Sequence, residues 1–315
     1  MTTYSSTTWP IAAAMLPFSN SQDADTATWV SQLSEVAYEG FQHVDITDCW
    51  IQPGDLDTSG LERVREALDT VGIEAIALSA IRKSVIDPVT GNDNLAYSHR
   101  TLDAAAKLGL GIVSFGLHRP LLPNQQEVQW FWTEDGPVDS TDAETWELAI
   151  TRIRELGKHA ADLGIQLSLE MYEDTLIGTT EGVVRIVDGV GLDNVGVNPD
   201  LGNLYRLHRE IESFQGAVET LAPISNYWHV KNYYRDEDRA RGFVTSVPAP
   251  MESGSMNYRA AIKTALAAGY NAAFCVEHYG GDGLSVAAAN ARYIRKLIAV
   301  ANGEAQQEVL SRKNS

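Results

Sequence analysis

The sequence predicts an α/β fold of the (β/α)8 type, a TIM barrel, from three observations. Short apolar segments alternate with longer amphipathic segments along the 315 residues, which is typical of βα units. Many amphipathic segments end at a glycine that a strand-like run follows at once, as at Gly40, Gly72 and Gly109, and glycine readily takes the left-handed conformation just past a helix. Eight such strand–helix pairs in a chain of this length fit a single barrel.

Each element can be placed by its pattern. The expected strands cover residues 11–16, 41–46, 75–79, 111–116, 165–170, 194–199, 225–230 and 272–277. The expected helices cover residues 24–38, 59–71, 93–108, 142–163, 179–189, 208–221, 257–268 and 284–301. The strands are almost continuously apolar, as in a parallel sheet buried on both faces. A doubly wound open sheet is the alternative, but the first strand–helix turn has no GxGxxG signature. We therefore expect one barrel domain over residues 1–315.

Two connections are longer than the others, at about residues 118–140 and 232–256. Both follow a strand and precede a helix, so in a barrel they lie on the carboxyl-terminal face, where active sites form. Trp130, Phe131 and Trp132 in the first connection favour an ordered loop that covers a substrate. Packing of this loop against its own barrel or against a partner chain is the alternative.

The formal net charge of −18 narrows the class of partners. Such an acidic protein repels phosphate backbones, which argues against nucleic acid. Cys49 and Cys275 lie in apolar segments and are too few for a disulfide scaffold, so we expect reduced thiols and a cytoplasmic protein. The amino-terminal stretch lacks the basic region of a signal peptide. No run approaches the roughly 18 apolar residues of a membrane span, so we expect no membrane association.

Four ligand-type residues each end an apolar strand segment in the second half of the chain: Glu170, Asp200, His229 and Glu277. On a barrel, the ends of four successive strands converge over one part of the rim. Any one of them alone has an ordinary explanation, such as a helix cap or a structural histidine, but the common register of all four predicts a metal site. Carboxylates and an imidazole suit a divalent cation. We expect one Mn²⁺, with Mg²⁺ or Co²⁺ as alternatives.

The segments around these residues, LSLE, NPDLGN, HVKN and VEH, resemble the xylose-isomerase-like barrels of the sugar phosphate isomerase/epimerase superfamily. The resemblance runs over roughly residues 10–302. In the ketose epimerases of that group two metal-binding glutamates also act as acid and base, which implies this role for Glu170 and Glu277. Those enzymes usually carry a histidine three residues after the aspartate, where this chain has Asn203. They often carry an arginine six residues after the metal histidine, and Arg235 matches.

A narrower resemblance rests on NPDLGNLYR, WHVKNY and EHYGGDGLSV. These segments are similar to the large (alpha) subunit of bacterial C-glycoside deglycosidases. That resemblance implies a carbon–carbon lyase that cleaves 3-oxo-C-glycosides by β-elimination, paired with a small beta subunit in a hetero-oligomer. A metal-dependent ketose isomerase or epimerase is the alternative. Both reactions begin with loss of a proton beside a ketone, which a bound cation favours and a positioned base accepts.

Further residues are candidates for the acid–base and substrate-binding groups. His118 ends the fourth strand, and Lys231 shares a strand face with His229, although a structural ion pair explains Lys231 equally well. The candidate substrate-binding residues are Asp45, Asp48, Tyr172, Asn203, Arg235 and His278. Tyr172 could instead orient Glu170, and Asp45 and Asp48 could cap a helix. The remaining histidines, His43, His99, His159 and His208, are expected to be structural or surface residues.

Two other classes of protein were weighed. A metal-dependent abasic-site endonuclease would need more histidines and a basic face for DNA, which seven histidines and a charge of −18 do not favour. A barrel without enzymatic activity would have no reason to keep all four ligand types. The sequence therefore favours a metal-dependent carbohydrate enzyme.

Overall fold

The computed structural model describes residues 4–238 and 240–312. Within these residues, eight parallel strands form one sheet in the order β6-β5-β4-β3-β2-β1-β10-β7. The strands are β1 (Ile11–Ala14), β2 (His43–Thr47), β3 (Glu74–Ala80), β4 (Ile112–Gly116), β5 (Gln166–Glu170), β6 (Val195–Asn198), β7 (Trp228–Val230) and β10 (Phe274–Val276). The edges β6 and β7 meet through a parallel bridge between Val197 and Ser225. The sheet is thus a nearly closed barrel, as predicted.

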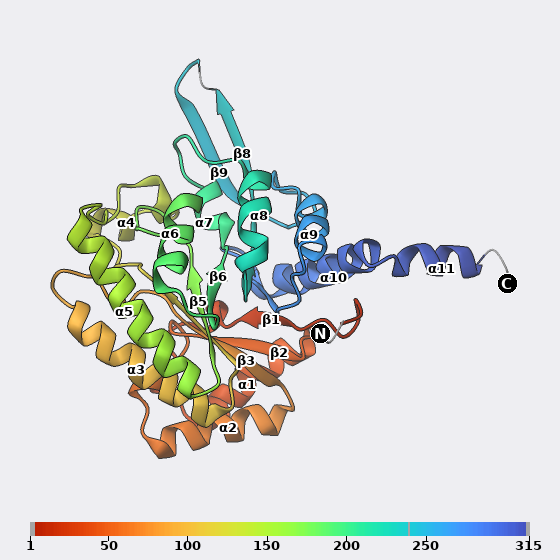
Figure 1. Ribbon diagram of the computed structural model, residues 1–315. Helices are drawn as coiled ribbons and strands as arrows, with labels where there is room; N and C mark the ends of the chain where they lie inside the picture. Colours follow the sequence, from red (N-terminus) through yellow and green to blue (C-terminus); the bar gives the residue numbers. More distant parts are fainter. Residues whose placement is uncertain (1–3, 239, 313–315) are drawn as a thin grey trace.

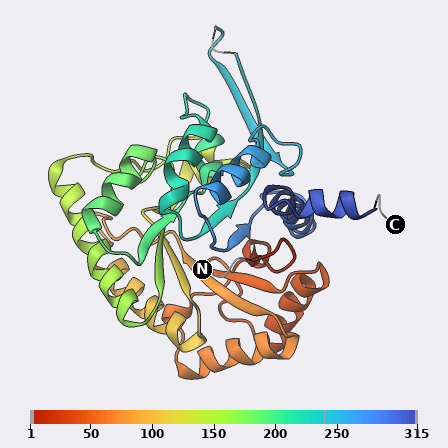
Figure 2. The same ribbon diagram turned by 45° about the vertical axis from the view of Figure 1, so that its right-hand side comes forward.

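Helices cover the outside of the strands (Figures 1 and 2). The longer ones are α1 (Thr26–Tyr38), α2 (Thr58–Val71), α3 (Gly91–Leu108), α5 (Ala143–Asp162), α6 (Thr180–Val190), α8 (Phe214–Leu221), α9 (Tyr258–Ala267), α10 (Gly283–Ala301) and α11 (Glu304–Arg312). Shorter turns are η1 (Leu16–Phe18), η2 (Pro53–Asp55), α4 (Pro123–Gln126), η3 (Phe131–Thr133), α7 (Leu201–Tyr205) and η4 (Ala222–Ile224). Gly72 and Gly109 end α2 and α3 at φ 74° and 79°, so the helix–glycine–strand pattern is confirmed at these two positions.

The core lies in two places. Large apolar side chains fill the layer between strands and helices, for example Val44, Ile46 and Leu167, all fully buried. Each such side chain contributes about 1.5–3 kcal/mol relative to an exposed one. Smaller side chains, among them Ala12 and Ala77, belong to a separate cluster with Tyr227 and Cys275. The polar side chains of the barrel interior lie at the other end, where the strands reach their carboxyl termini.

The two long connections differ from each other. Residues 118–140 hold only α4 and η3 as regular structure, and their Trp132 is buried. Residues 232–256, expected as a loop, contain an antiparallel hairpin of β8 (Asn232–Asp238) and β9 (Phe243–Ala249), which projects from the barrel (Figure 1). The expectation missed this hairpin because its two strands pair only with each other, because β8 is rich in charged residues, and because a proline interrupts β9. The domain boundaries 1–315 stay a prediction.

The helix expected at residues 208–221 is shorter in the structure than predicted. It begins only at Phe214, because the hydroxyl of Ser213 accepts a hydrogen bond from Gly216 N at 3.3 Å and caps the helix there. The short α7 precedes it and follows β6 directly. Among the described residues, no helix is both long and apolar enough to cross a membrane.

Candidate metal centre

The four predicted ligands lie together at the carboxyl-terminal ends of their strands. Glu170 is the last residue of β5, Asp200 follows β6, His229 lies in β7 and Glu277 follows β10. One ligand atom each from Glu170, Asp200 and His229 fall within 4.8 Å of one another. His229 Nδ1 is 2.8 Å from Glu277 Oε1 and 3.4 Å from Glu170 Oε2. Glu170 and Glu277 thus face the same imidazole nitrogen, and Asp200 belongs to one group with Glu170 and His229.

The charges of this cluster are buried and only partly balanced. None of the four side chains is more than 6% exposed. Lys231 Nζ contacts Asp200 Oδ2 and lies 2.6 Å from Glu277 Oε2, so one ammonium faces three carboxylates. Buried charges without partners are costly. A divalent cation would compensate the carboxylate charge that this one ammonium leaves unbalanced.

Two atoms of the cluster lack a hydrogen-bond partner and are available as ligands for such an ion. His229 Nδ1 and Asp200 Oδ1 are buried and make no hydrogen bond in the described structure. The 2.8 Å contact of Nδ1 with Glu277 lacks hydrogen-bond geometry, so we treat it as two ligand atoms facing a common point. Buried polar atoms are almost always satisfied in native proteins. The donor set and its free atoms thus fit a divalent cation.

Burial changes the acidity of these groups. It raises the pKa of Glu170 to about 7, and the neighbouring charge of Glu277 adds to this effect. It also raises the pKa of Asp200 to about 7, although Lys231 opposes the change. Burial acts on Glu277 in the same direction, but Lys231 and His229 together lower the pKa of that carboxyl. Without an ion, Glu170 and Asp200 therefore hold protons near neutral pH.

Cation binding is expected to weaken as the pH falls from 8 to 6, because protons compete for Glu170 and Asp200. The raised pKa values also mean that the native ion-free protein binds more protons than the unfolded chain below about 7, so its stability should fall as the pH rises through this range. Calorimetric titration at the two pH values, with parallel thermal unfolding, checks both signs. Equal affinities at pH 6 and pH 8 would contradict the expected competition.

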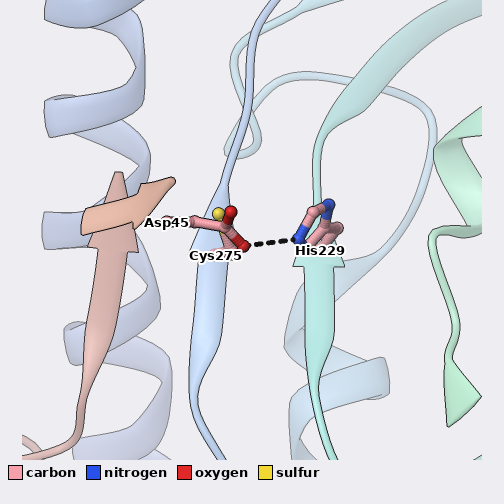
Figure 3. Close-up of side chains that lie close together, drawn as sticks. All are labelled: Asp45, His229 and Cys275. Carbon is pink, nitrogen blue, oxygen red and sulfur yellow. Dashed lines mark hydrogen bonds and ion pairs between the residues drawn. The ribbon is translucent and has the colours of Figure 1, made fainter. Parts of the chain in front are cut away.

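The second ring nitrogen of His229 faces a different carboxylate. His229 Nε2 lies 3.2 Å from Asp45 Oδ2, as Figure 3 shows together with the nearby Cys275. The same oxygen accepts hydrogen bonds from Tyr227 Oη at 2.6 Å and from Ser79 Oγ at 2.8 Å. Histidines that bind metals commonly donate their other N–H to a carboxylate, which fixes the ring and its tautomer. This arrangement turns the Nδ1 lone pair of His229 towards the cluster.

A second group of ligand-type atoms consists of Asp45, His229 and Cys275. Burial raises the pKa of the Cys275 thiol to about 12, so the thiol stays protonated. Asp45 Oδ2 already accepts two hydroxyl hydrogen bonds. The group around Glu170 is therefore the better candidate for a cation. Asp45 is fully buried beneath His229, and this placement suits positioning of the imidazole rather than the predicted contact with substrate.

An Asp45→Asn variant is expected to bind a divalent cation about 10- to 100-fold more weakly, because His229 loses the anionic partner of its Nε2–H. Calorimetric titration with Mg²⁺ measures the change, and near-UV circular dichroism confirms that the variant is folded. The Cys275→Ser variant, altered beside the same imidazole, serves as the control and should keep the wild-type affinity. Unchanged binding in Asp45→Asn would rule out a positioning role for this carboxylate.

Asn198 links the ligands at the seam where the barrel is least closed. Its Oδ1 accepts a hydrogen bond from His229 N at 2.7 Å, and its Nδ2 donates to Glu170 Oε2 at 3.4 Å. One side chain on β6 thereby connects ligands on β5 and β7. Sequence reasoning missed Asn198, Ser79 and Tyr227, because each is a common residue within an apolar strand segment.

The family can now be stated. The model of the family described as xylose isomerase-like TIM barrel matches residues 30–297 of the sequence. The chain belongs to the xylose isomerase-like TIM barrel family. No curated protein matches the sequence.

Solved structures with this fold agree with the assignment. A xylose isomerase-like TIM barrel protein from Mycobacterium smegmatis in complex with magnesium is 45% identical, with a TM-score of 0.90 over 95% of this chain and 99% of that one. An L-ribulose 3-epimerase is 15% identical, with a TM-score of 0.70 over 95% and 97% of the two chains. The 3-keto-D-glucoside 4-epimerase of E. coli is 16% identical, with a TM-score of 0.64 over 91% and 99%. The last two show the fold alone.

A cleft of about 430 Å³ opens beside the candidate metal centre. Asp48 and His278, both predicted to bind substrate, line it together with Arg82, Phe131 and Tyr279. The ring of Tyr279 lies 5.4 Å from Lys231 Nζ, which connects the cleft to the cluster. Burial raises the pKa of Asp48 to about 6 and lowers the pKa of His278. Both side chains thus line the cleft, and their contact with a substrate stays a prediction.

His118 lies beside the cluster but is enclosed. Its side chain has no exposed surface, its ring packs against the ring of Tyr172 with centroids 3.7 Å apart and a tilt of 38°, and its Nε2 is 3.5 Å from Glu170 Oε1. Burial holds the pKa of His118 well below its usual value, so the imidazole is neutral at pH 7. The position suits contact with Glu170 more than the predicted direct acid–base contact with substrate. Tyr172 accepts a hydrogen bond from Arg82 at 3.2 Å, and Arg82 rather than Tyr172 lines the cleft.

Two predicted substrate-binding residues have other partners. Asn203 Nδ2 donates to Asp200 Oδ2 at 2.9 Å and to Met171 O at 3.0 Å, because one turn of α7 brings it back beside the ligand. Arg235 lies on the hairpin and donates to the carbonyl oxygens of Tyr205 and Leu207. The structure thus places Asn203 as a support for Asp200 and does not bring Arg235 to the cluster.

Arg206 is the main group near the site that sequence reasoning did not single out. It is fully buried and donates two hydrogen bonds to Glu173, at 2.9 and 3.0 Å. Its guanidinium carbon lies 4.7 Å from the ring centroid of Phe131 and 4.9 Å from that of Trp132. Tyr172 and Tyr279 complete this aromatic surrounding at 5.5 and 5.8 Å. The arginine thereby ties the 118–140 connection to the rim of the barrel.

Proposed function

We propose that this protein is a divalent-metal-dependent enzyme that acts on a keto sugar and interconverts it as an isomerase or epimerase. The observation that carries the proposal is the pair of carboxylates, Glu170 and Glu277, that face the same nitrogen of His229 from two different strands. Asp200 completes the donor set, and a cleft opens beside it. The epimerase names of two structural relatives support a carbohydrate substrate.

The chemistry needs proton transfer at the carbon next to a ketone. A divalent cation, when bound, would supply the Lewis acid that makes this carbon acidic. Glu170 and Glu277 are the carboxylates placed to remove the proton and to return one, to another carbon in isomerisation or to the other face in epimerisation. The Lys231 ammonium, 2.6 Å from Glu277 Oε2, would stabilise negative charge that develops nearby. Mg²⁺ has the support of the M. smegmatis relative, whereas Mn²⁺ and Co²⁺ rest on the donor set alone.

Hydrogen exchange in D₂O tests this proposal. Free ketoses and 3-oxo-glucosides are incubated with the protein and Mg²⁺ or Mn²⁺, and NMR follows deuterium entering beside the carbonyl. We expect exchange that requires the cation and falls by at least about 100-fold in Glu170→Gln and Glu277→Gln, as for loss of a general base. Glu74→Gln, which alters an exposed glutamate at the opposite end of β3, should not change the rate. Exchange that survives in both site variants would contradict the proposal.

A second function, cleavage of 3-oxo-C-glycosides, is favoured by the wall of the cleft. Leu16, Pro17, Ile81 and Phe131 give this wall an apolar side that suits an aromatic aglycone. In such a β-elimination the base takes the C2 proton, a C1–C2 double bond forms, the C1–aryl bond breaks, and the aryl carbon takes up a proton. The predicted small beta subunit would need an exposed surface, and the hairpin offers Tyr234 and Phe243, 46% and 51% exposed.

One assay separates the two reactions. The protein is incubated with a 3-oxo-C-glucoside and with free ketoses, with and without a co-expressed small subunit. Release of the aglycone supports the lyase. Sugar interconversion without any release of aglycone rules the lyase out and leaves the isomerase or epimerase.

A further inference from the structure

Arg82 is a cation in the wall of the cleft, and among the described salt bridges it has no carboxylate partner. Its side chain lines the cleft together with Asp48 and His278 and is partly buried. Its described hydrogen bonds go to two neutral acceptors, from Nη1 to Arg119 O at 3.1 Å and from Nη2 to Tyr172 Oη at 3.2 Å. A guanidinium has five N–H donors, so three of them are left for a ligand.

A second guanidinium packs on the same two aromatic rings, and this one does have a carboxylate. The guanidinium carbon of Arg82 lies 5.5 Å from the ring centroids of Phe131 and Tyr172. The guanidinium carbon of Arg206 lies 4.7 and 5.5 Å from the same two centroids, and Glu173 accepts two hydrogen bonds from Arg206. Two like charges therefore share one carboxylate, and the positive charge that remains is the one at the wall of the cleft.

Asp48, the carboxyl group of the same cleft, does not fill this gap. Its Oδ2 accepts a hydrogen bond from Ile81 N at 3.1 Å, and no described salt bridge joins it to Arg82. Burial raises the pKa of Asp48 to about 6, and the charge of Arg82 opposes this change. At neutral pH the cleft thus offers a carboxylate that can accept a sugar hydroxyl and, separately, a guanidinium without an ion pair. Partly buried charges of this kind are costly until an anion reaches them.

We propose that the keto sugar bound in this cleft carries an anionic group, a carboxylate or a phosphate, and that Arg82 binds this group. The inference rests on the proposed function, since it takes the cleft beside the metal centre as the place of the sugar. A guanidinium matches carboxylate and phosphate oxygens with two parallel N–H donors. The anion would compensate a charge that no described carboxylate pairs with, which a neutral sugar cannot do. Arg82 is then a specificity-determining residue.

Three ketohexoses that differ only at C6 test the inference: D-fructose, D-fructuronate and D-fructose 6-phosphate. Calorimetric titration of the full-length protein at a constant concentration of free Mg²⁺ measures their affinities. We expect at least one of the two anionic sugars to bind about 10- to 100-fold more tightly than D-fructose, the ratio that hydrogen bonds to a charged group provide. The sugar that binds more tightly identifies the group as a carboxylate or a phosphate.

Variants of two neighbouring cations assign the preference to one side chain. Arg82→Gln should bind the anionic sugars about as weakly as D-fructose. Arg82→Lys keeps the charge but not the planar pair of donors, so it should keep part of the preference. Lys83→Gln removes the same charge from the next residue, which does not line the cleft, and should keep the wild-type preference. Circular dichroism confirms that each variant is folded.

The inference is overturned if neither anionic sugar binds more tightly than D-fructose, or if Arg82→Gln keeps the preference. Arg82 would then only hold Tyr172 and Arg119 in place. Deuterium exchange beside the carbonyl judges the proposed function separately. A preference for an anionic sugar without any exchange would keep the anion site and reject the reaction, whereas exchange of D-fructose without such a preference would keep the reaction and reject the anion site.

Discussion

Replacing Glu170 by Gln is expected to reduce the affinity for a divalent cation by at least about 100-fold while leaving the ion-free protein as stable as the wild type or more stable. The loss follows because a central ligand carboxylate is removed. The stability is expected to be kept because Glu170 is buried beside two other carboxylates. Among the described salt bridges, Lys231 is the only cation apart from histidine that contacts these carboxylates. Burial and the charge of Glu277 raise the pKa of Glu170 to about 7, so glutamine replaces a carboxyl group whose charged form the ion-free site disfavours. Calorimetry and thermal unfolding with and without Mg²⁺ measure both effects.

The control for this experiment is Glu74→Gln, which changes a glutamate at the amino-terminal end of β3. It should bind the cation like the wild type and show the same increase in melting temperature on addition of Mg²⁺. Glu277→Gln should behave like Glu170→Gln in binding. Retention of both the affinity and the Mg²⁺-dependent stabilisation in Glu170→Gln would show that the cation binds elsewhere.

Replacing Arg206 by Met is expected to destabilise the protein by about 3–5 kcal/mol, the range for breaking a buried ion pair by removing one partner. Glu173, only 6% exposed, would lose both of its hydrogen bonds to the guanidinium. The contacts of Arg206 with Phe131 and Trp132 would also be lost, so the 118–140 connection should loosen. Urea unfolding gives the free energy, and acrylamide quenching of tryptophan fluorescence reports on the loop.

The double variant Arg206→Met/Glu173→Gln separates the ion pair from the packing. Most of the lost stability should return, because the glutamate charge is no longer buried without a partner. The loop should stay loosened, since the aromatic rings still lack the guanidinium. A cost below about 1 kcal/mol for Arg206→Met alone would instead place this pair among weak surface salt bridges.

The barrel was largely predictable because its signals are local. The expected strand at 165–170 is observed as Gln166–Glu170, and the expected helix at 59–71 as Thr58–Val71. An apolar run between a helix-ending glycine and a polar residue is enough to place such elements. The hairpin of β8 and β9 was not predictable in this way, since β8 is rich in charged residues and a proline interrupts β9. Only some of its side chains, such as Tyr233 and Ser246, are buried.

In the candidate site, too, the residues with local sequence signals were predictable and the others were not. Glu170 and Asp200 could be found because each ends an apolar strand segment, and the strand ends of a barrel converge. The residues that hold these ligands in place could not be found from the sequence, because they come from distant parts of the chain. Tyr227 and Asp45, for example, are 182 residues apart in sequence. The position of Arg235 could not be foreseen either, because it depends on the hairpin, which the sequence did not predict.

Diffraction from crystals soaked in Mn²⁺, with anomalous difference maps, tests the central claim most directly. We predict one strong peak among Glu170, Asp200, His229 and Glu277, at about 2.0–2.3 Å from their ligand atoms, and the loss of this peak in Glu170→Gln. A map with no peak at this cluster, or with the peak between Asp45 and Cys275, would contradict the assignment of the metal centre.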